Sequence, residues 1–385
     1  MRGIGVIGCG ARLRSLLRRI PGLGSDIVLT AICDPSEASR RAALALTGGA
    51  RVYDDYRDLV RAPDVDWVLV GSWNCYHREH AVAALEAGKH VYCEKPLATT
   101  LDDCLAMRDA WRASRRIFCL GLVLRYSPHY QRIREILRSG QLGRIVSMEF
   151  NETLHYEHGG YIHGDWRRLV RWAGPHVLEK CCHDLDLVLW LTGSIPIRAA
   201  SFGGVNFFKP ENAHYVEDLG PHANGLPAFG SWAATTGSTP LNPFTAEKDI
   251  IDNQVAILEF ESGIRATFHT NCATNLPERR MYICGTEGTL RADVRTGSIE
   301  YRRIGHQEEL QRADTGAKGG HGGGDQILAS SLRDTILNGT TPLADPEDGV
   351  RSAITAFGID AAMNAGTVVD LRPMWRRAGI TTAEQ

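Results

Sequence analysis

The chain has 385 residues, with 43 basic and 45 acidic side chains and 43% hydrophobic residues. This length and ordinary composition predict two or three globular domains and exclude wholesale disorder or a fibrous structure. A net charge of −2 predicts neither a nucleic-acid-binding surface nor a polybasic membrane patch. No apolar run reaches the roughly 20 residues that span a bilayer, so we expect no membrane or nucleic-acid partner.

The ten cysteines indicate a reducing compartment. They run from Cys9 to Cys284 without a Cys-x-x-Cys pair, a pattern that favours neither a disulfide framework nor a structural zinc site. Met1 and Arg2 lead directly into an apolar strand pattern, with no signal peptide or cleavage site. We expect a cytoplasmic protein.

The first part of the chain alternates short apolar runs with helical patterns, which is typical of βαβ units around a parallel sheet. The strands are expected at residues 3–8, 27–33, 65–71, 90–93 and 118–122. Helices are expected at 11–20, after the second strand and ending at residue 46, at 79–86 and at 101–113. The pattern predicts an α/β Rossmann dinucleotide-binding domain over residues 1–123.

Residues 124–385 predict an α+β domain with a largely antiparallel open sheet, which would bind substrate and mediate oligomerisation. Helices are expected at 128–138, 175–191, 325–338 and 347–365. Strands are expected at 144–151, 254–260, 264–271, 280–284, 289–294 and 298–304. Residues 203–246 are rich in Gly, Pro, Asn and Thr and are predicted to form an inserted loop; such long loops are usually functional.

The first predicted strand ends in a glycine turn. Gly8 permits a tight turn and Gly10 leaves room for a pyrophosphate beside the backbone, followed by Ala11 and Arg12. Leu13 stands where the third glycine of a dinucleotide fingerprint belongs, so the motif is degenerate.

An acidic residue ends the second predicted strand. Asp34 can accept hydrogen bonds from both adenosine ribose hydroxyls and would repel a 2′-phosphate, which favours NAD over NADP. The alternative is that Asp34-Pro35-Ser36 only caps the next helix.

The sequence Gly88-Lys89-His90-Val91-Tyr92-Cys93-Glu94-Lys95-Pro96-Leu97 places a charged pair directly after a buried strand. Such a pair is costly there unless it is functional, although it can also be a surface ion pair. This motif resembles the Gfo/Idh/MocA oxidoreductases, the family of glucose–fructose oxidoreductase and inositol dehydrogenase. The resemblance covers nearly the whole chain, including Gly8-Cys9-Gly10, Leu124-Arg125-Tyr126, Leu142-Gly143-Arg144-Ile145 and Gly285-Thr286-Glu287-Gly288.

The resemblance implies a catalytic site at Lys95. The lysine would lie beside the nicotinamide and the reacting hydroxyl, with its pKa lowered by burial and with Glu94 orienting it. It also implies that further residues contact the cofactor: Ser72, Trp73, Asn74, His77, Arg125, Trp166 and Arg167. Trp73 replaces a proline of the family pattern and either packs on the cofactor or fills the end of the strand.

The second catalytic element is Glu179-Lys180-Cys181-Cys182-His183-Asp184-Leu185-Asp186. The spacing of Glu179, His183 and Asp186 predicts one shared helix face, which is usually solvated. The family pattern is Asp-x-Gly-x-His, and the resemblance makes His183 the general acid/base toward the substrate hydroxyl. Glu179 and Cys181 depart from that pattern, which puts the substrate geometry in doubt.

The remaining candidates would bind substrate. They are Lys95, His155, Tyr161, Arg167, Glu179, His183 and His321. His155, His158 and His163 are candidate metal ligands, but their spacing fits no standard metal site, and we expect no metal. His321-Gly-Gly-Gly-Asp325 is either a substrate loop or a flexible connection.

These observations predict an NAD-dependent oxidoreductase acting on a ring hydroxyl of a sugar, an inositol or a glycoside. The alternative is an NAD-dependent glycoside hydrolase, similar to sulfoquinovosidase, that acts by transient oxidation, elimination, hydration and re-reduction. A non-catalytic NAD-binding sensor is a third reading, and Glu94-Lys95-Pro96 and His183 argue against it. The resemblance also implies a homo-oligomer, a dimer or a tetramer.

Overall fold

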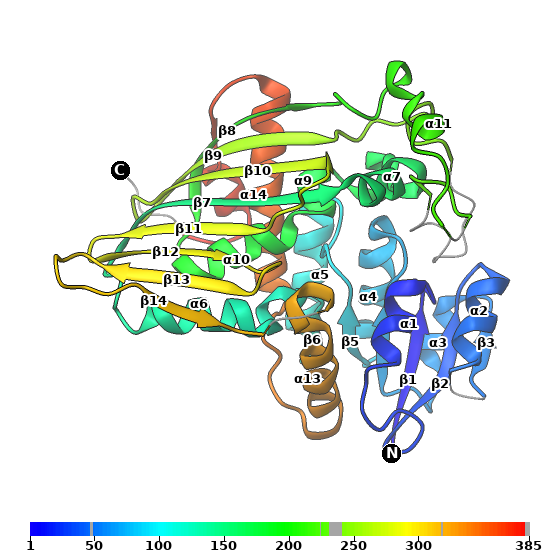
Figure 1. The fold of residues 1–385 in the computed structure, drawn as a ribbon. Helices are drawn as coiled ribbons and strands as arrows, with labels where there is room; N and C mark the ends of the chain where they lie inside the picture. Colours follow the sequence, from blue (N-terminus) through cyan, green and yellow to red (C-terminus); the bar gives the residue numbers. More distant parts are fainter. Residues whose placement is uncertain (47–48, 224, 231–240, 317–318, 382–385) are drawn as a thin grey trace.

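The computed structural model describes residues 1–46, 49–223, 225–230, 241–316 and 319–381. Two sheets organise this part of the chain, one near the N-terminus and one built from the second half (Figure 1). This is the α/β plus α+β architecture expected from the sequence.

The first sheet is parallel, with the strand order β3-β2-β1-β4-β5-β6. Its strands are β1 (Arg2–Ile7), β2 (Ile27–Cys33), β3 (Arg51–Tyr53), β4 (Trp67–Val70), β5 (His90–Cys93) and β6 (Phe118–Leu120). Its helices are α1 (Ala11–Leu17), α2 (Glu37–Leu44), α3 (Tyr56–Arg61), α4 (His77–Glu86) and α5 (Leu101–Ser114), with a 3-10 turn η1 (Asn74–Tyr76) before α4. The sequence analysis did not predict β3 or α3. The edge strand β3 exposes Arg51 and Val52 and therefore has no apolar run by which to recognise it.

The second sheet has the order β14-β13-β12-β11-β7-β10-β9-β8-β15. Its strands are β7 (Ile145–His155), β8 (Pro196–Gly204), β9 (Asn253–Phe260), β10 (Arg265–Thr274), β11 (Arg280–Gly285), β12 (Gly288–Asp293), β13 (Ser298–Arg303), β14 (Gln311–Asp314) and β15 (Val369–Asp370). Only the β7–β10 pair is parallel among the described pairs, so the sheet is largely antiparallel as predicted.

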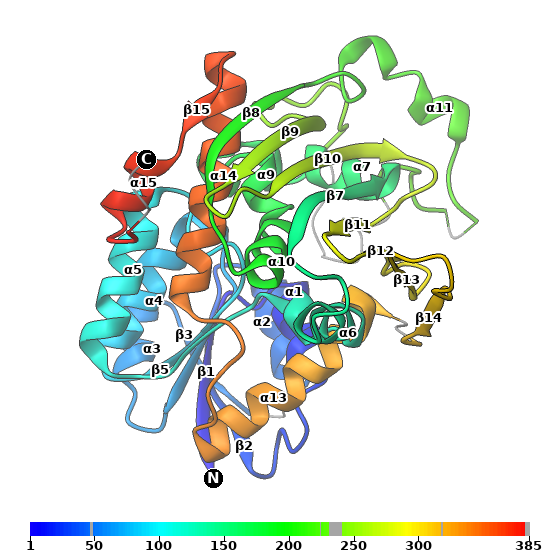
Figure 2. The same cartoon turned by 90° about the vertical axis from the view of Figure 1, so that its left-hand side faces the viewer.

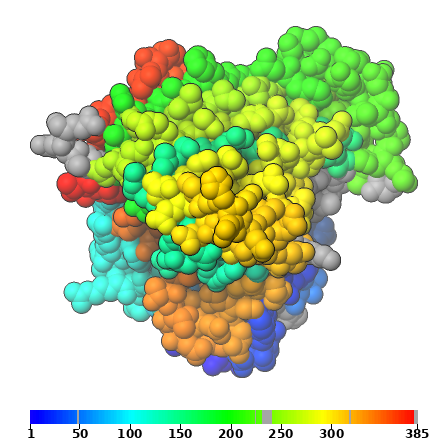
Figure 3. All heavy atoms as spheres, turned by 60° about the vertical axis from the view of Figure 1, so that its left-hand side comes forward, coloured from blue at the N-terminus to red at the C-terminus, as the bar shows by residue number. Residues whose placement is uncertain are grey.

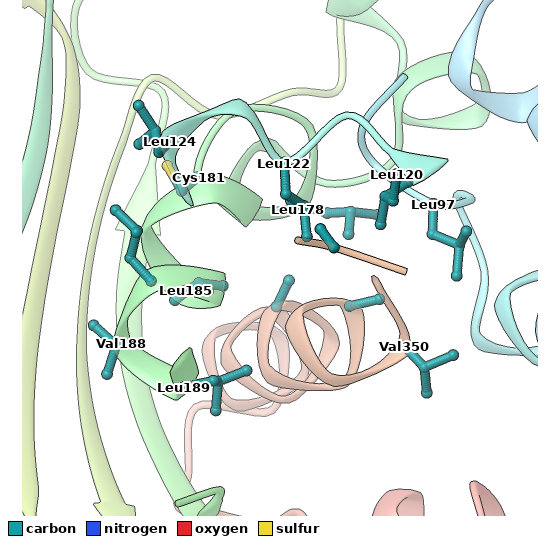
Figure 4. Close-up of a cluster of buried hydrophobic side chains, with 14 of the residues drawn as sticks. Leu97, Leu120, Leu122, Leu124, Leu178, Cys181, Leu185, Val188, Leu189 and Val350 are labelled. Atoms are coloured by element: carbon teal, nitrogen blue, oxygen red, sulfur yellow. The ribbon is translucent and has the colours of Figure 1, made fainter. Parts of the chain in front are cut away.

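Helices cover one face of the second sheet and join it to the first (Figure 2). They are η2 (Val123–Tyr126), α6 (Pro128–Arg138), α9 (His176–Glu179), α10 (Cys182–Thr192), α14 (Pro346–Ala365) and α15 (Arg372–Arg377). Leu120 and Leu122 of the first part meet Leu178 and Leu185 of the second, with Val350 of α14 beside them (Figure 4). The two parts therefore share one hydrophobic core.

Another helix returns from the second half of the chain to the first sheet. A 3-10 turn η5 (Gly320–Gly323) leads into α13 (Gly324–Asn338), whose Leu328 and Leu332 are buried in one cluster with Ile4 and Leu13. Although it lies beyond residue 124 in sequence, α13 packs with the dinucleotide-binding domain. This arrangement brings the glycine-rich segment before α13 to the carboxyl ends of the parallel strands.

The helix expected at residues 175–191 is broken in two, α9 and α10, at Lys180 and Cys181. Cys181 has φ −97° and ψ 3° and serves as the N-cap of α10. The prediction of one continuous face carrying Glu179, His183 and Asp186 is therefore wrong. At the break, the Glu179 carbonyl accepts a hydrogen bond from Lys95 Nζ of the other domain at 2.5 Å.

The described residues of the inserted segment 203–246 contribute to a small aromatic core; residues 224 and 231–240 lie outside the described part. Its elements include η4 (Pro210–Asn212) and α11 (Tyr215–Leu219). Phe208, Phe229 and Phe244 are buried together against α7 (Tyr156–Gly164). Two more short elements follow α7, namely η3 (Trp166–Arg168) and α8 (Val170–Ala173).

Candidate functional site

The glycine turn after β1 has the backbone geometry that a dinucleotide site needs. Gly8 has φ +85°, and a Cβ there would lie 2.4 Å from the Ser72 backbone nitrogen, so only glycine fits. A Cβ at Gly10 would meet nothing within 4 Å, which leaves the backbone open to an incoming group. The missing third glycine is compensated at Gly71, where a Cβ would lie 2.4 Å from Leu13 Cγ.

Arg12 follows the turn and binds two carboxylates. Its Nε lies 2.8 Å from Glu94 and its Nη1 2.5 Å from Asp325. Its Nη2 is buried and has no hydrogen-bond partner among the described residues. A buried guanidinium N–H beside an open glycine turn suits an anionic group, so these residues fit the pyrophosphate of a dinucleotide.

Asp34 braces the turn from the end of β2. Its carboxylate accepts hydrogen bonds from the Cys9 N–H at 2.6 Å and from the Ser36 N–H at 2.7 Å. The sequence reading overlooked Arg40, whose guanidinium donates to the Asp34 carbonyl at 3.1 Å. Its position one turn into α2 is the signal that would have identified it.

The segment after β4 divides into buried and accessible residues. His77 is fully buried, and its ring nitrogens lie 2.8 Å from the Pro96 carbonyl and 3.2 Å from the Ser72 carbonyl. Asn74 donates to the Ala173 carbonyl at 2.9 Å. His77 and Asn74 therefore hold the loop that carries Ser72 and Trp73, and these two remain accessible.

Trp73 stacks on Trp166, a contact that the sequence did not predict. The ring centroids are 5.1 Å apart with an interplanar angle of 12°, and Trp172 packs against Trp73 at 5.7 Å. Arg167 lies over the Trp166 ring at 4.3 Å. The stack joins the two domains beside the site and leaves Trp73 41% exposed.

Lys95 and Glu179 form the centre of the site. Besides its bond to the Glu179 carbonyl, Lys95 Nζ lies 3.7 Å from the Glu179 carboxylate. Arg167 binds the same carboxylate at 3.2 Å and donates to the Tyr161 hydroxyl at 2.6 Å and to Asp165 at 3.0 Å. The structure thus brings together four of the predicted site residues, of which Lys95 comes from a distant part of the chain: Lys95, Tyr161, Arg167 and Glu179.

The charges of this centre follow from its contacts. Burial is the largest single influence and disfavours the ammonium of Lys95, but the neighbouring groups together, Glu179 first among them, outweigh it and raise the pKa of Lys95. Burial likewise opposes ionisation of Glu179, but Lys95 and Arg167 outweigh it and lower the pKa of Glu179 to about 2. The expectation of a lowered pKa for Lys95 is therefore wrong in its net direction, and Lys95 is a cation at neutral pH.

His183 has the opposite character. It is 3% exposed, and its Nδ1 is buried with no hydrogen-bond partner in the described part of the chain. Burial, with the nearby charge of Lys95, holds the pKa of His183 well below its ordinary value of 6.5. A neutral imidazole with an available nitrogen can accept a proton.

Arg125, expected at the cofactor, is buried and engaged elsewhere. It binds Asp186 through two nitrogens at 2.6 and 2.8 Å, Asp348 at 2.9 Å and the Leu343 carbonyl at 2.8 Å. The arrangement fastens η2 to α10 and α14. It gives Arg125 a structural role in place of the expected cofactor contact.

The histidines near α7 are not brought together. His155 lies 3.6 Å from Glu157, whereas His163 is fully buried and stacks on Phe208 at 4.5 Å. Among the described residues, one group has metal-ligating atoms within 4.8 Å of one another: Glu152, Cys181 and Asp184. Arg279 lies 3.0 Å from Glu152 and 2.7 Å from Asp184, and cations therefore already neutralise these carboxylates.

Comparisons with known proteins agree with this geometry. A model of the oxidoreductase family with an NAD-binding Rossmann fold matches residues 2–122, and a model of that family's C-terminal alpha/beta domain matches residues 134–371. Within the described residues, no helix has both the length and the apolarity needed to cross a membrane.

Relatives and solved structures carry dehydrogenase names. Inositol 2-dehydrogenase of Ralstonia nicotianae is 36% identical over 198 residues, which are 51% of this chain and 56% of the relative. The chain thus spans only about half the length of that relative. A levoglucosan dehydrogenase in complex with NADH and levoglucosan has a TM-score of 0.77 at 19% identity, over 96% of this chain and 99% of the other. Myo-inositol 2-dehydrogenase from Lactobacillus plantarum has a TM-score of 0.71 at 19% identity, over 96% and 99%.

Proposed function

This chain belongs to the Gfo/Idh/MocA family of oxidoreductases, with an NAD-binding Rossmann domain, and we propose that it oxidises a ring hydroxyl of a sugar, an inositol or a glycoside. The inositol and levoglucosan dehydrogenases among its relatives and structural neighbours support a polyhydroxylated substrate. Bound NAD supplies the hydride acceptor. The protein must therefore orient the hydroxyl and take its proton.

His183 is the proton acceptor in this proposal. Its neutral ring suits removal of the hydroxyl proton, which a cation cannot perform. Lys95 instead donates: one ammonium N–H is bound to the Glu179 carbonyl, and the other two are available to the substrate oxygen. The positive charge of Lys95 would stabilise the negative charge that develops on that oxygen.

Glu179 and Arg167 position this pair. Arg167 fixes the Glu179 carboxylate, and Glu179 in turn holds Lys95 in its charged form and in place through its carbonyl. The observation that carries the proposal is this combination of a cationic Lys95 with a neutral, buried His183 at the end of the parallel sheet.

The test is NADH formation with myo-inositol, levoglucosan and a panel of monosaccharides. The parent protein is expected to reduce NAD with at least one of them, and Lys95→Met and His183→Asn are expected to lower kcat by about 10²–10⁴-fold. Unchanged turnover in Lys95→Met would contradict the assignment. A second assay uses a chromogenic glycoside as substrate. Release of free sugar without net formation of NADH would indicate the glycoside hydrolase instead.

We further propose that NAD is preferred over NADP. Asp34 places a carboxylate beside the glycine turn, where a 2′-phosphate would be repelled. Arg40 lies beside this position, and its guanidinium donates to the Asp34 carbonyl and lies 3.7 Å from Asp54.

The uncovered face of the second sheet supports a homo-oligomer. Phe202 pairs with Val255 across β8 and β9, and Ile257 lies on the same face two residues along. These side chains are 72%, 47% and 60% exposed. Figure 3 shows atoms of the later strands of this sheet, in yellow-green to gold, at the surface of the molecule. We propose that a second copy of the chain covers this face.

A further inference from the structure

A second histidine faces His183 from the segment before α13. The rings of His183 and His321 meet edge to face, with centroids 5.6 Å apart and an interplanar angle of 60°. His321 Nδ1 lies 3.0 Å from the Asp325 carboxylate, which leaves Nε2 as the nitrogen free of that contact. The His321 side chain is 29% exposed and that of His183 is buried, so His321 is the more accessible to solvent.

Asp325 is held as a carboxylate between two cationic or proton-bearing partners. Burial opposes its ionisation, but the hydrogen bond to His321 and the charge of Arg12 outweigh burial and lower the pKa of Asp325. Arg12 is itself fixed by Glu94, which also accepts the Tyr92 hydroxyl at 2.7 Å. Asp325 is therefore a rigidly placed anion that can stabilise a protonated His321 ring.

The backbone of His321 is strained in a way that favours its ring being functional. His321 has φ +53°, and Arg115 is the only other non-glycine residue with positive φ in the described part of the chain. Gly319, Gly322 and Gly323 around it also have positive φ. Left-handed backbone is unfavourable for a residue with a Cβ, and glycine at position 321 would avoid that strain.

We propose that the His321–Asp325 pair is the proton exit of the active site. In each turnover the proton that His183 takes from the substrate hydroxyl passes to Nε2 of His321, directly or through one water. The N–H bond on His183 breaks as the bond at His321 Nε2 forms, while the proton on Nδ1 stays bonded toward Asp325. His321 then releases the Nε2 proton to solvent, and both rings return to their neutral forms.

This inference rests on the proposed function, because it needs a hydroxyl proton to remove. The groups that face His321 are Asp325 on its own segment, Arg12 on α1, His158 on α7, Lys180 after α9 and His183 on α10. Burial lowers the pKa of His321 despite Asp325. His321 is thus neutral before turnover, which allows it to accept the proton.

The decisive variant is His321→Gly, because glycine accepts the left-handed backbone while the ring is lost. We expect unchanged or higher thermal stability, a kcat lower by 10- to 100-fold with a smaller change in KM, and recovery of kcat on addition of imidazole to the assay. Arg115→Gly is the matched control: it makes the same backbone change at the end of α5 and should neither lower kcat nor respond to imidazole. Unchanged kcat in His321→Gly, or a loss that imidazole does not rescue, would overturn the proton exit.

A second measurement needs no substrate. Histidine-selective NMR titration of the parent and of Asp325→Asn should show a lower pKa for His321 in the variant, since the stabilising carboxylate is gone. An unshifted His321 would also overturn the pairing. Failure of the proposed function is distinguishable, because the parent itself would then turn over none of the sugars, inositol or glycosides.

Discussion

At the scale of single residues, the site depends on opposite charge states of two neighbouring groups. Lys95 stays charged because Glu179 offsets burial, and His183 stays neutral because burial and Lys95 act in the same direction. A lysine alone could serve as the base only after losing its proton. The pairing therefore separates the two tasks, with His183 accepting the proton and Lys95 stabilising the oxygen.

This charge assignment predicts a particular pH dependence. In the parent, kcat/KM should be flat from about pH 6.5 upward, because His183 is already neutral there and Lys95 loses its proton only above its ordinary pKa of 10.5. Glu179→Gln removes the offsetting carboxylate, so burial and Arg167 should lower the pKa of Lys95. An alkaline loss of activity should then enter the range of pH 7–10. The exposed control Glu287→Gln should keep the pH profile of the parent. An alkaline limb that also stays in place in Glu179→Gln would contradict the assignment.

A second prediction at this scale concerns cofactor choice. Asp34→Asn keeps an oxygen to accept the Cys9 N–H but removes the charge, while Arg40 remains nearby. We expect the ratio of kcat/KM for NAD to that for NADP to fall by about tenfold or more, which corresponds to roughly 1.4 kcal/mol. Steady-state kinetics with both cofactors give the ratio. A parent protein that prefers NADP would refute the role of Asp34.

At the scale of elements, the sequence was informative wherever local patterns decide the structure. Buried parallel strands form continuous apolar runs, so β2 and β5 were predicted with the observed bounds, and α6 likewise. The edge strand β3 was not predicted, because its exposed residues do not form an apolar run. The glycine turn could be located from the sequence. That Gly71 makes room for Leu13, which replaces the third glycine, could not be predicted, because the two residues are distant in the chain.

The break between α9 and α10 shows what local patterns cannot contain. Residues 175–191 have an uninterrupted helical pattern, whereas in the structure Lys95 of the other domain binds the Glu179 carbonyl where the helix is interrupted. The resemblance to the family identified Lys95 and His183 as site candidates. It also assigned Arg125 to the cofactor, because a motif match does not show which carboxylates surround a residue.

Arg125 provides the prediction at this scale. Arg125→Met should leave Asp186 and Asp348 without their cation and lower the free energy of unfolding by about 3–5 kcal/mol. The KM for NAD should change less than twofold. Chemical denaturation and steady-state kinetics measure the two effects. The control Arg265→Met removes an exposed pair with Glu259 and should cost less than about 1 kcal/mol. A large rise in KM with unchanged stability would restore the cofactor role.

At the scale of the whole molecule, the site is assembled from both domains and from a returning helix. The first domain supplies Lys95 and Arg12, the second supplies Glu179 and His183, and the segment before α13 supplies His321. A common hydrophobic core holds the two domains together (Figure 4), and α13 packs in a second cluster with the first domain. With one face of the second sheet occupied by helices, its other face is left for association.

That face gives the last prediction. Phe202, Val255 and Ile257 expose apolar side chains side by side, and covering them in a second copy would remove this surface from water. We expect the parent to be a dimer or tetramer in light scattering after size-exclusion chromatography. Ile257→Glu should dissociate it, because a carboxylate at the centre of an apolar interface is buried without a partner. Val52→Glu, at a similarly exposed position on the edge strand of the other sheet, should leave the assembly intact. A monomeric parent, or an Ile257→Glu protein of unchanged mass, would show that this face is not the interface.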